Sequence, residues 1–353
     1  MYNDQTILNG AKNQKGSVSL MKKTTFIFIS FALVLLFAAP SLAEPEIVLR
    51  FAGQGTVEHT GTVMMEQVAK EVLEKTNGRI EIKVYPANML GDYTLVFEEL
   101  MRGTIDMASI SVPSQFNPNL EATYINCFVS GYDEAKKVFA EGSWLFNKMN
   151  ELCLELGVRV LGFQVTGFIG IASTKPVNEP LVPGVDKGVL VRIPNMDVYK
   201  MGAETMGYKT VTIPWADVYT SMQTGVCDGV DGMDTVAAWD NLKDIMKYWY
   251  QLNYSVENWN YLISEITWNK LSPEDQKIIA DACSKVTQIG VDLAREDQDK
   301  HLQLMRDRGI EVFTYTPEEL QPIFEAVSAT WENLKGKFDP AMIDEFTKEY
   351  GKK

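Results

Sequence analysis

One arginine lies within an apolar stretch, where burying its charge is energetically unfavourable. Arg192 interrupts the apolar stretch Val189-Leu190-Val191-Arg192-Ile193, a pattern typical of a buried strand. Strands of a parallel sheet are covered on both faces, and a buried guanidinium needs a carboxylate, phosphate or carbonyl partner. Either an internal acid pairs with Arg192, or the guanidinium holds the carboxylate of a ligand through two parallel hydrogen bonds. The strand alone leaves both alternatives open.

The patterns that mark common catalytic and cofactor sites are missing from the sequence. Gly53-Gln54-Gly55 follows a predicted strand, but Glu58 occupies the place of the third glycine of a dinucleotide fingerprint. There is no G-x-S-x-G, no Walker loop and no cysteine pair at zinc spacing. Asp228, Asp231 and Asp234 recur every three residues, which does not fit an EF-hand, and we expect turn and helix-capping roles for them. No cofactor, metal site or catalytic residue is predicted.

Histidines are scarce, and aromatic residues are concentrated in one segment. The two histidines, His59 and His301, exclude a multi-histidine metal site. His59, at a predicted strand–helix junction, is expected to be a structural residue, with a role as ligand or base as the alternative. Residues 215–268 are rich in Trp and Tyr, most of which should be core, while some could line a ligand pocket.

Composition restricts the class of protein. The chain has 353 residues, a net charge of −14, 46% hydrophobic and 23% charged residues, which is the range of soluble globular proteins of about two domains. This acidity disfavours nucleic acid, whose phosphates are bound by Lys and Arg. The four cysteines are widely spaced, and buried free thiols are favoured over disulfides.

The first 43 residues have the layout of a secretory signal peptide. Met21-Lys22-Lys23 is followed by an apolar run of about 14 residues from Phe26 to Ala39 and by small residues up to Ala43. The run is shorter than a membrane span, so we expect cleavage after Ala43 rather than a retained anchor. Met21 is expected to be the true start. The predicted location is the periplasm.

Strands and helices alternate along the chain that follows. Strands are predicted at 47–51, 80–86 and 106–110, with helices at about 61–76 and 93–102 between them. The same order returns over 188–230, with Gly103-x-x-Asp106 echoed by Gly225-x-x-Asp228. This alternation predicts an α/β protein of two similar lobes with mostly parallel sheets flanked by helices.

One predicted helix is much longer than the others. Ser272-Pro273-Glu274-Asp275 is a strong helix start, and no stop signal follows before Gly309. About 35 residues at 1.5 Å each give about 50 Å, more than the width of one lobe. We therefore expect this helix to brace both lobes, with Gly290 bending it or allowing close packing. Further helices are predicted to begin at Thr316 and Asp339.

Three motifs resemble the solute-binding subunits of tripartite ATP-independent periplasmic (TRAP) transporters, in the dicarboxylate-binding-protein-like family. They are the segments Gly188–Asn195, Ile213–Tyr219 and Gln223–Gly229. Gly78-Arg79-Ile80 and Arg102-Gly103 support the likeness, which extends over the chain after the signal segment. The resemblance implies a two-lobed, non-enzymatic "Venus flytrap" that closes around a small organic acid. It also implies membrane permease subunits as partners.

The resemblance also implies lobe boundaries and site residues. The lobes are expected to be 44–166 with about 258–290, and 167–257 with about 291–315, with 316–353 forming C-terminal helices across both. Arg192 matches the family arginine that pairs with the ligand carboxylate, which favours the ligand-binding alternative. Further candidates for the ligand site are Trp215, Phe168, Asp231, His59, Tyr93 and Gly232.

Departures from the family pattern shape the expected ligand. Ile169 follows Gly167-Phe168 where a second arginine is common, and Asp231-Gly232 replace the usual Glu and Asn or Trp. Anchors for sugar acids and metal-bridged keto acids are thus partly missing. The sequence therefore favours a monocarboxylate with a bulky, fairly apolar, even aromatic body, bound by a monomer. The alternatives are a periplasmic enzyme with paired carboxylates and a ligand-sensing module for a membrane receptor.

Overall fold

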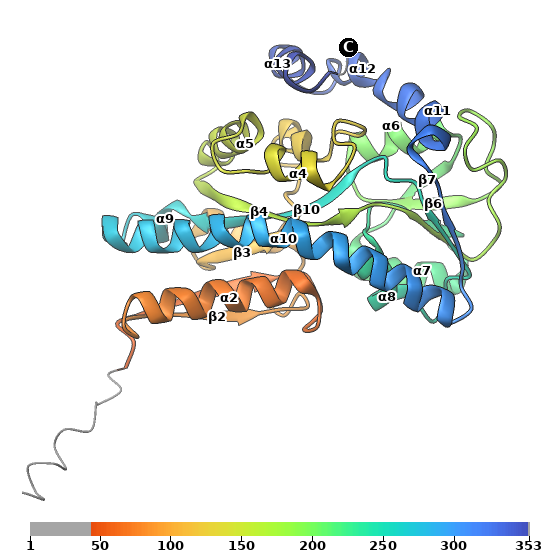
Figure 1. Cartoon of the computed structure of the whole chain (residues 1–353). Coiled ribbons are helices and arrows are strands. Elements are labelled where there is room, and N and C mark those ends of the chain that lie inside the picture. Colours follow the sequence, from red (N-terminus) through yellow and green to blue (C-terminus); the bar gives the residue numbers. More distant parts are fainter. Residues whose placement is uncertain (1–43, 352–353) are drawn as a thin grey trace, which may run out of the picture. The chain divides into compact units, whose positions relative to one another are not determined.

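The computed structural model describes residues 44–351, so the predicted signal peptide at 1–43 lies outside the described residues. Two β-sheets, each with helices around it, form the two lobes (Figure 1). Within residues 44–351, no helix has both the length and the apolar character needed to cross a membrane.

The first sheet has the strand order β2-β1-β3-β10-β4. Its strands are β1 (Ile47–Gly53), β2 (Ile80–Tyr85), β3 (Met107–Ile110), β4 (Val158–Phe168) and β10 (Val256–Ser264). β1 pairs in parallel with β2 and β3, whereas β10 runs antiparallel to both β3 and β4. The sheet is therefore mixed rather than purely parallel.

The second sheet has the order β11-β9-β5-β8-β6-β7. Its strands are β5 (Ile171–Ser173), β6 (Leu190–Ile193), β7 (Lys209–Thr212), β8 (Gly229–Val230), β9 (Tyr248–Gln251) and β11 (Glu311–Thr314). β6, which carries Arg192, pairs in parallel with β7 and β8, and β5 is antiparallel to β8 and β9. β6 thus lies between two neighbours of the same direction, as the apolar pattern around Arg192 predicts.

The antiparallel pairs arise where the chain passes between the lobes. β4 of the first sheet continues into β5 of the second, and β9 returns to the first sheet as β10. At the first passage a Cβ on Gly170 would lie 2.6 Å from the carbonyl oxygen of Tyr250, so the two crossing segments approach at a distance that only glycine permits. Two short adjacent connections of this kind suit a hinge between lobes.

Helices cover both sheets (Figure 1). Their bounds are α2 (Thr60–Lys75), α3 (Tyr93–Arg102), α4 (Tyr132–Val138), α5 (Trp144–Leu154), α6 (Asp197–Met206), α7 (Val218–Thr224), α8 (Thr235–Leu242), α9 (Glu265–Trp268), α10 (Pro273–Asp307), α11 (Pro317–Ser328), α12 (Trp331–Leu334) and α13 (Pro340–Tyr350). Two 3₁₀ turns add η1 (Pro118–Tyr124) and η2 (Trp215–Asp217). All four cysteines are buried thiols, as predicted.

The long helix predicted from the Ser272-Pro273 start is α10, 35 residues long. The Ser272 side chain accepts a hydrogen bond from the Asp275 N–H and caps the helix. α10 packs on β4 and α2 in the first lobe and on α8 and β11 in the second, so it braces both (Figure 1). Gly290 allows close packing, since a Cβ there would lie 2.9 Å from the Gln164 amide nitrogen.

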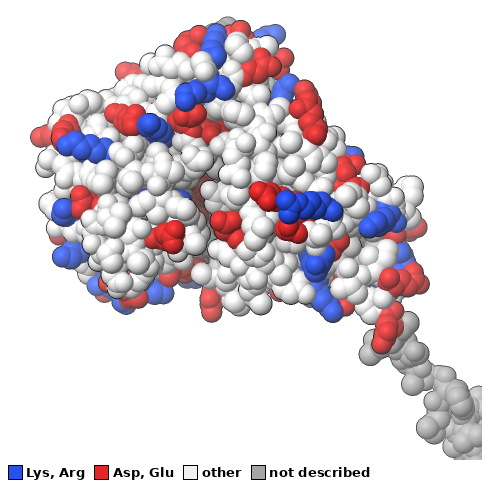
Figure 2. Space-filling view, turned by 180° about the vertical axis from the view of Figure 1, so that it is seen from behind, with Lys and Arg blue, Asp and Glu red and all other residues white. Residues whose placement is uncertain are grey.

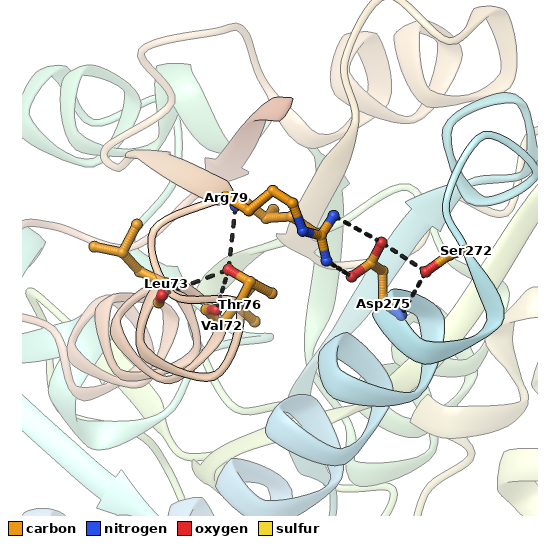
Figure 3. A network of polar contacts seen from close by, with 7 residues as sticks. Val72, Leu73, Thr76, Arg79, Ser272 and Asp275 are labelled. Carbon is orange, nitrogen blue, oxygen red and sulfur yellow. Dashed lines mark hydrogen bonds and ion pairs between the residues drawn. The ribbon is translucent and has the colours of Figure 1, made fainter. Parts of the chain in front are cut away.

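An ion pair ties the start of α10 to the first sheet (Figure 3). The Arg79 guanidinium donates two hydrogen bonds to the carboxylate of Asp275, which also accepts from the Ser272 hydroxyl at 2.7 Å. Beside it, the Thr76 hydroxyl donates to the Val72 carbonyl and accepts from the Ile80 N–H. The Gly78-Arg79-Ile80 segment thus positions α10 and is not part of the cavity described below.

The echo between the two halves has a structural basis. Gly103 and Gly225 both end a helix in the left-handed conformation, at φ 72° and 78°. The aspartates that follow each accept a hydrogen bond from the backbone of a neighbouring strand: Asp106 from the Arg50 N–H and Asp228 from the Leu190 N–H. Each Gly-x-x-Asp therefore ends a helix and fixes the next strand in its sheet.

Candidate functional site

A cavity between the lobes is lined by residues of both. Its empty space, which includes open solvent at its mouth, is about 650 Å³. The lining residues are Gln54, Gly55, Thr56, His59, Tyr93, Ser111, Tyr124, Arg192, Pro194, Met196, Tyr199, Trp215, Gly232, Met233, Asp234, Ala237, Asn241, Glu257 and Trp259. Figure 2 shows one face of the molecule, with a narrow crevice between two halves and charges of both signs scattered around it.

Arg192 is held in the cavity wall by backbone carbonyls. The side chain is 2% exposed; its Nε donates to the Ile213 carbonyl at 2.8 Å and its Nη1 to the Asp231 carbonyl at 3.3 Å. Within the described residues, no carboxylate forms an ion pair with it. Burial lowers the pKa of Arg192, but a guanidinium remains charged. The fork is thus oriented by neutral groups, and Nη2 makes no hydrogen bond to the described part of the chain.

Aromatic rings form much of the wall. The Arg192 guanidinium carbon lies 5.6 Å from the centre of the Trp215 ring, a cation–π contact that further fixes both groups. Trp259 lies against the first turn of α2, where a Cβ on Gly61 would be 2.3 Å from the indole. Gly55 faces the same ring, so the rejected dinucleotide motif has a packing explanation: its second glycine makes room for Trp259.

The structure brings together five of the seven residues expected in the site. These five residues all line the cavity: Arg192, Trp215, His59, Tyr93 and Gly232. The other two lie outside its lining. Phe168 is buried with its ring against Tyr132, at 5.0 Å between centroids.

Asp231 contacts residues of the cavity wall although its own side chain does not line the cavity. Its carboxylate accepts hydrogen bonds from the Tyr254 hydroxyl and the Gly232 N–H, and its carbonyl accepts from Arg192. Burial raises the pKa of Asp231 to about 7. Its contacts therefore position Arg192 and Gly232 and leave no side-chain face on the cavity.

His59 combines a structural role with a place in the wall. It caps α2, where its Nδ1 accepts a hydrogen bond from the Gly61 N–H at 3.0 Å. Its ring also packs on Trp259, with centroids 4.6 Å apart. Burial lowers the pKa of His59, so the ring is neutral. His59 thus has the capping contact of a structural residue, and the same residue lines the cavity.

Glu257, in β10, is a cavity residue that the sequence reasoning missed. It is 7% exposed; its carboxyl accepts from the Tyr199 hydroxyl at 2.9 Å and, more weakly, from Ser111 at 3.4 Å. Burial raises the pKa of Glu257 to about 8, and the charge of Asp234 adds to the effect. The sequence carries little signal for it, because Glu257 lies among the polar residues Ser255, Asn258 and Asn260 and does not stand out as Arg192 does.

Asp234 was expected to cap a helix, and it does so with one of its two carboxyl oxygens. Its Oδ1 accepts from the Val236 and Ala237 N–H groups at the start of α8, at 2.8 and 3.0 Å. Its Oδ2 is buried and has no hydrogen-bond partner within the described residues. Among the described residues that line the cavity, Arg192 is the only cationic side chain, and Asp234 and Glu257 contribute carboxyl groups.

The comparisons with known proteins agree on one family. The model of "Bacterial extracellular solute-binding protein, family 7" matches residues 50–337. The sialic acid-binding periplasmic protein SiaP of Vibrio cholerae is 23% identical over 296 residues, covering 83% of this chain and 88% of its own length. The C4-dicarboxylate-binding periplasmic protein DctP of the same species is 25% identical over 337 residues, covering 92% and 98%.

Solved structures show the same fold. A TRAP periplasmic solute-binding protein from Haemophilus influenzae with bound L-gulonate superposes with a TM-score of 0.76 at 20% identity, covering 86% of this chain and 99% of its own. One from Desulfovibrio salexigens with bound orotic acid has a TM-score of 0.76 at 21% identity, covering 86% and 97%. Since the family model spans most of the sequence, the chain belongs to family 7 of the bacterial extracellular solute-binding proteins, the periplasmic binding proteins of TRAP transporters.

Proposed function

We propose that the protein captures a small monocarboxylate between its lobes and delivers it to the membrane permease subunits of a TRAP transporter. The observation that carries the proposal is Arg192, a buried guanidinium in the cavity wall that two carbonyls orient and no described carboxylate neutralises. A ligand carboxylate would supply the missing anion through charge-assisted hydrogen bonds. Export by the segment 1–43 and action as a monomer belong to the same proposal.

Closure of the lobes explains how one arginine can give useful affinity. Inside a closed cavity the effective dielectric constant is lower than in water, so the attraction between Arg192 and a carboxylate is stronger. A ligand that touches both lobes binds the closed form better than the open one and shifts the hinge equilibrium toward closure. The permease would then recognise the closed form.

The remaining lining favours one carboxylate on an apolar body. Trp215, Trp259, Tyr93 and Met196 present apolar surface to the cavity. A second carboxylate would find no cation, because Arg192 is the only one among the described lining residues, and it would approach the carboxyl group of Asp234. A monocarboxylate with a bulky, fairly apolar or aromatic body therefore fits better than a dicarboxylate.

Paired carboxyl groups are also what a hydrolytic enzyme uses, and Asp234 with Glu257 forms such a pair in the cavity. However, family 7 consists of non-enzymatic binding proteins. Each carboxyl is also engaged by fixed neighbours: Asp234 by the N-terminus of α8 and Glu257 by Tyr199. We therefore assign both groups to ligand selection.

Substitution of Arg192 tests the proposal. Calorimetric titration with a panel of organic acids should find a monocarboxylate that binds the wild-type protein, and mass spectrometry of ligand released by denaturation should identify a carboxylate. Arg192→Ala should weaken binding about 100-fold or more, because two charge-assisted hydrogen bonds contribute about 1.5–3 kcal/mol each. Arg192→Lys should recover little of this, since an ammonium lacks the planar fork.

Controls separate binding from folding. Circular dichroism and thermal unfolding should show that both variants stay folded, although the Ile213 and Asp231 carbonyls lose their donor. Unchanged affinity of a folded Arg192→Ala variant contradicts the assigned role. Binding restricted to dicarboxylates contradicts the monocarboxylate, and binding restricted to sialic acid contradicts the fairly apolar body.

A further inference from the structure

Two buried polar atoms of the cavity wall lack partners, and they belong to neighbouring residues on opposite lobes. His59 is 3% exposed and Asp234 1% exposed, and both line the cavity. Within the described residues, neither the His59 Nε2 nor the Asp234 Oδ2 makes a hydrogen bond. Buried polar groups are nearly always satisfied, and because both residues line the cavity, a ligand group can supply the missing partner of each atom.

The hydrogen-bonding character of His59 follows from its other nitrogen. Nδ1 accepts a hydrogen bond from the Gly61 N–H, so it carries no proton, and the proton of the neutral ring is on Nε2. The cap and the contact with Trp259 fix the ring in place. The Nε2–H is therefore a pre-oriented donor.

Asp234 supplies the complementary acceptor. The two hydrogen bonds that Oδ1 receives from the start of α8 fix the carboxylate and leave Oδ2 free to accept another. His59 and Asp234 are near enough that Asp234 is the strongest of the nearby charges acting on His59, yet no hydrogen bond joins them. The His59 Nε2–H is thus an unused donor on one lobe, and the Asp234 Oδ2 is an unused acceptor on the other.

Only one common ligand group satisfies both atoms with a single heavy atom. A hydroxyl oxygen accepts from the His59 Nε2–H and donates to the Asp234 Oδ2. A carboxylate cannot donate and would be repelled by Asp234, whereas an ammonium group cannot accept from His59. We propose that His59 and Asp234 form a subsite for an alcohol or phenol hydroxyl, which makes the ligand a hydroxy monocarboxylate.

This subsite lies apart from the arginine. The charged or titratable groups that act most strongly on Arg192 are Tyr93, Asp231, Glu257 and Tyr199, and neither His59 nor Asp234 is among them. The charges of both Asp234 and Arg192 act on Glu257, which lines the same cavity. The hydroxyl therefore belongs on the part of the ligand remote from the carboxylate, near Trp259. The inference rests on the proposed binding of a carboxylate at Arg192.

Matched pairs of acids test the subsite. We choose phenylacetate with 4-hydroxyphenylacetate, cinnamate with 4-hydroxycinnamate, and hexanoate with 6-hydroxyhexanoate, which place the hydroxyl at different distances from the carboxylate. In calorimetric titrations the hydroxylated acid of at least one pair should bind the wild-type protein about tenfold or more tightly than its partner, the scale expected for buried groups that would otherwise stay unpaired.

Two variants that keep a capping acceptor, and one control, assign the preference to the pair. Asp234→Asn keeps the capping oxygen and replaces the free acceptor by a donor, while His59→Asn keeps a cap and removes the Nε2 donor. Each should reduce the preference for the hydroxylated acid to about threefold or less, with thermal unfolding as the check on folding. Asp297→Asn changes a charge near His59 outside the cavity lining and should keep the wild-type preference.

The outcomes separate the two proposals. If carboxylates bind in an Arg192-dependent way but no pair shows a preference, the subsite is refuted and the proposed function stands. A preference that survives in both variants also refutes the subsite. If no carboxylate binding depends on Arg192, the proposed function fails and the subsite fails with it.

Discussion

At the scale of single residues, the properties of the site depend on the hydrogen-bond partners of its buried ionisable side chains. Arg192 receives only carbonyl partners and remains a net positive charge. Glu257 receives the Tyr199 hydroxyl, and its pKa is raised to about 8 by burial, so it is mostly protonated at neutral pH. The cavity is therefore most favourable to an anion while Glu257 stays neutral.

The ionisation of Glu257 and Asp231 predicts weaker carboxylate binding as the pH rises. The pKa of Glu257 is about 8 and that of Asp231 about 7, both raised by burial, so both acids gain charge between pH 6 and 9. Each new charge repels a carboxylate held at Arg192. At the effective dielectric constant of about 20 used for protein sites, a charge about 12 Å away should cost about tenfold in affinity, and a nearer charge more. Titrations of the tightest-binding acid across this range measure the effect.

Glu257→Gln should remove part of that dependence. The variant keeps the hydrogen bond to Tyr199 but cannot ionise, so its affinity should fall less steeply with pH than that of the wild-type protein, with Asp231 responsible for the remainder. Glu98→Gln, on the exposed side of α3, is the matched control and should reproduce the wild-type slope. Equal slopes for Glu257→Gln and wild type contradict the role given to Glu257.

The residues of the site differ in how readily the sequence reveals them. Arg192 could be singled out because a charge inside an apolar strand has few explanations. Asp234 could not, because its capping role accounts for one oxygen and conceals the other. Phe168 and Asp231 were placed in the site by family resemblance, but which face of the chain they occupy depends on packing against Tyr132 and Tyr254.

At the scale of elements, the start of α10 makes a separate prediction. Arg79→Ala should lower the free energy of unfolding by about 1–2 kcal/mol, because it leaves the buried Asp275 carboxylate without its two strongest donors (Figure 3). This expected change is at the low end because Arg79 is itself partly exposed and its interaction is screened by solvent. Urea unfolding of the ligand-free protein measures it.

Arg102→Ala provides the comparison for Arg79→Ala. Arg102 pairs with Glu98 and Glu99 on the surface of α3, where ion pairs contribute about 0–1 kcal/mol. The decrease in the free energy of unfolding should be clearly smaller for Arg102→Ala than for Arg79→Ala. Equal effects of the two substitutions would show that the Arg79–Asp275 pair does not hold α10 to the first sheet.

Elements were more predictable than their partners in the sheets. The cap at Ser272 and the lack of a stop before Gly309 give α10 its length, since both are local signals. The antiparallel positions of β5 and β10 were not predicted, because they depend on where the chain crosses between the lobes. Periodicity indicates that a segment is a strand but not beside which strand it lies.

At the scale of the whole molecule, the two lobes are joined across the cavity by side chains as well as by the hinge. The Thr56 hydroxyl, in the loop after β1, donates to the Asp240 carboxylate of α8 at 2.7 Å. The Ser114 hydroxyl donates to the Asn195 carbonyl at 3.1 Å. These contacts exist only while the lobes are together, so they stabilise the closed form relative to an open one.

Thr56→Val should therefore weaken ligand binding without changing the ligand preference. The substitution keeps the shape of the side chain and removes one cross-lobe hydrogen bond, worth about 1 kcal/mol, so the dissociation constant should rise about fivefold. Because the contact forms on closure, most of the change should appear as faster dissociation. Stopped-flow fluorescence of the cavity tryptophans separates the two rates.

Small-angle scattering and a control variant complete this test. Ligand should reduce the radius of gyration of the wild-type protein, and a higher ligand concentration should be needed for the same reduction in Thr56→Val. Thr224→Val, at the exposed end of α7 with its hydroxyl bonded only within that helix, should behave as wild type. If Thr56→Val binds as tightly as wild type, the hinge and the ligand alone set the closed state, and the Thr56–Asp240 contact merely accompanies closure.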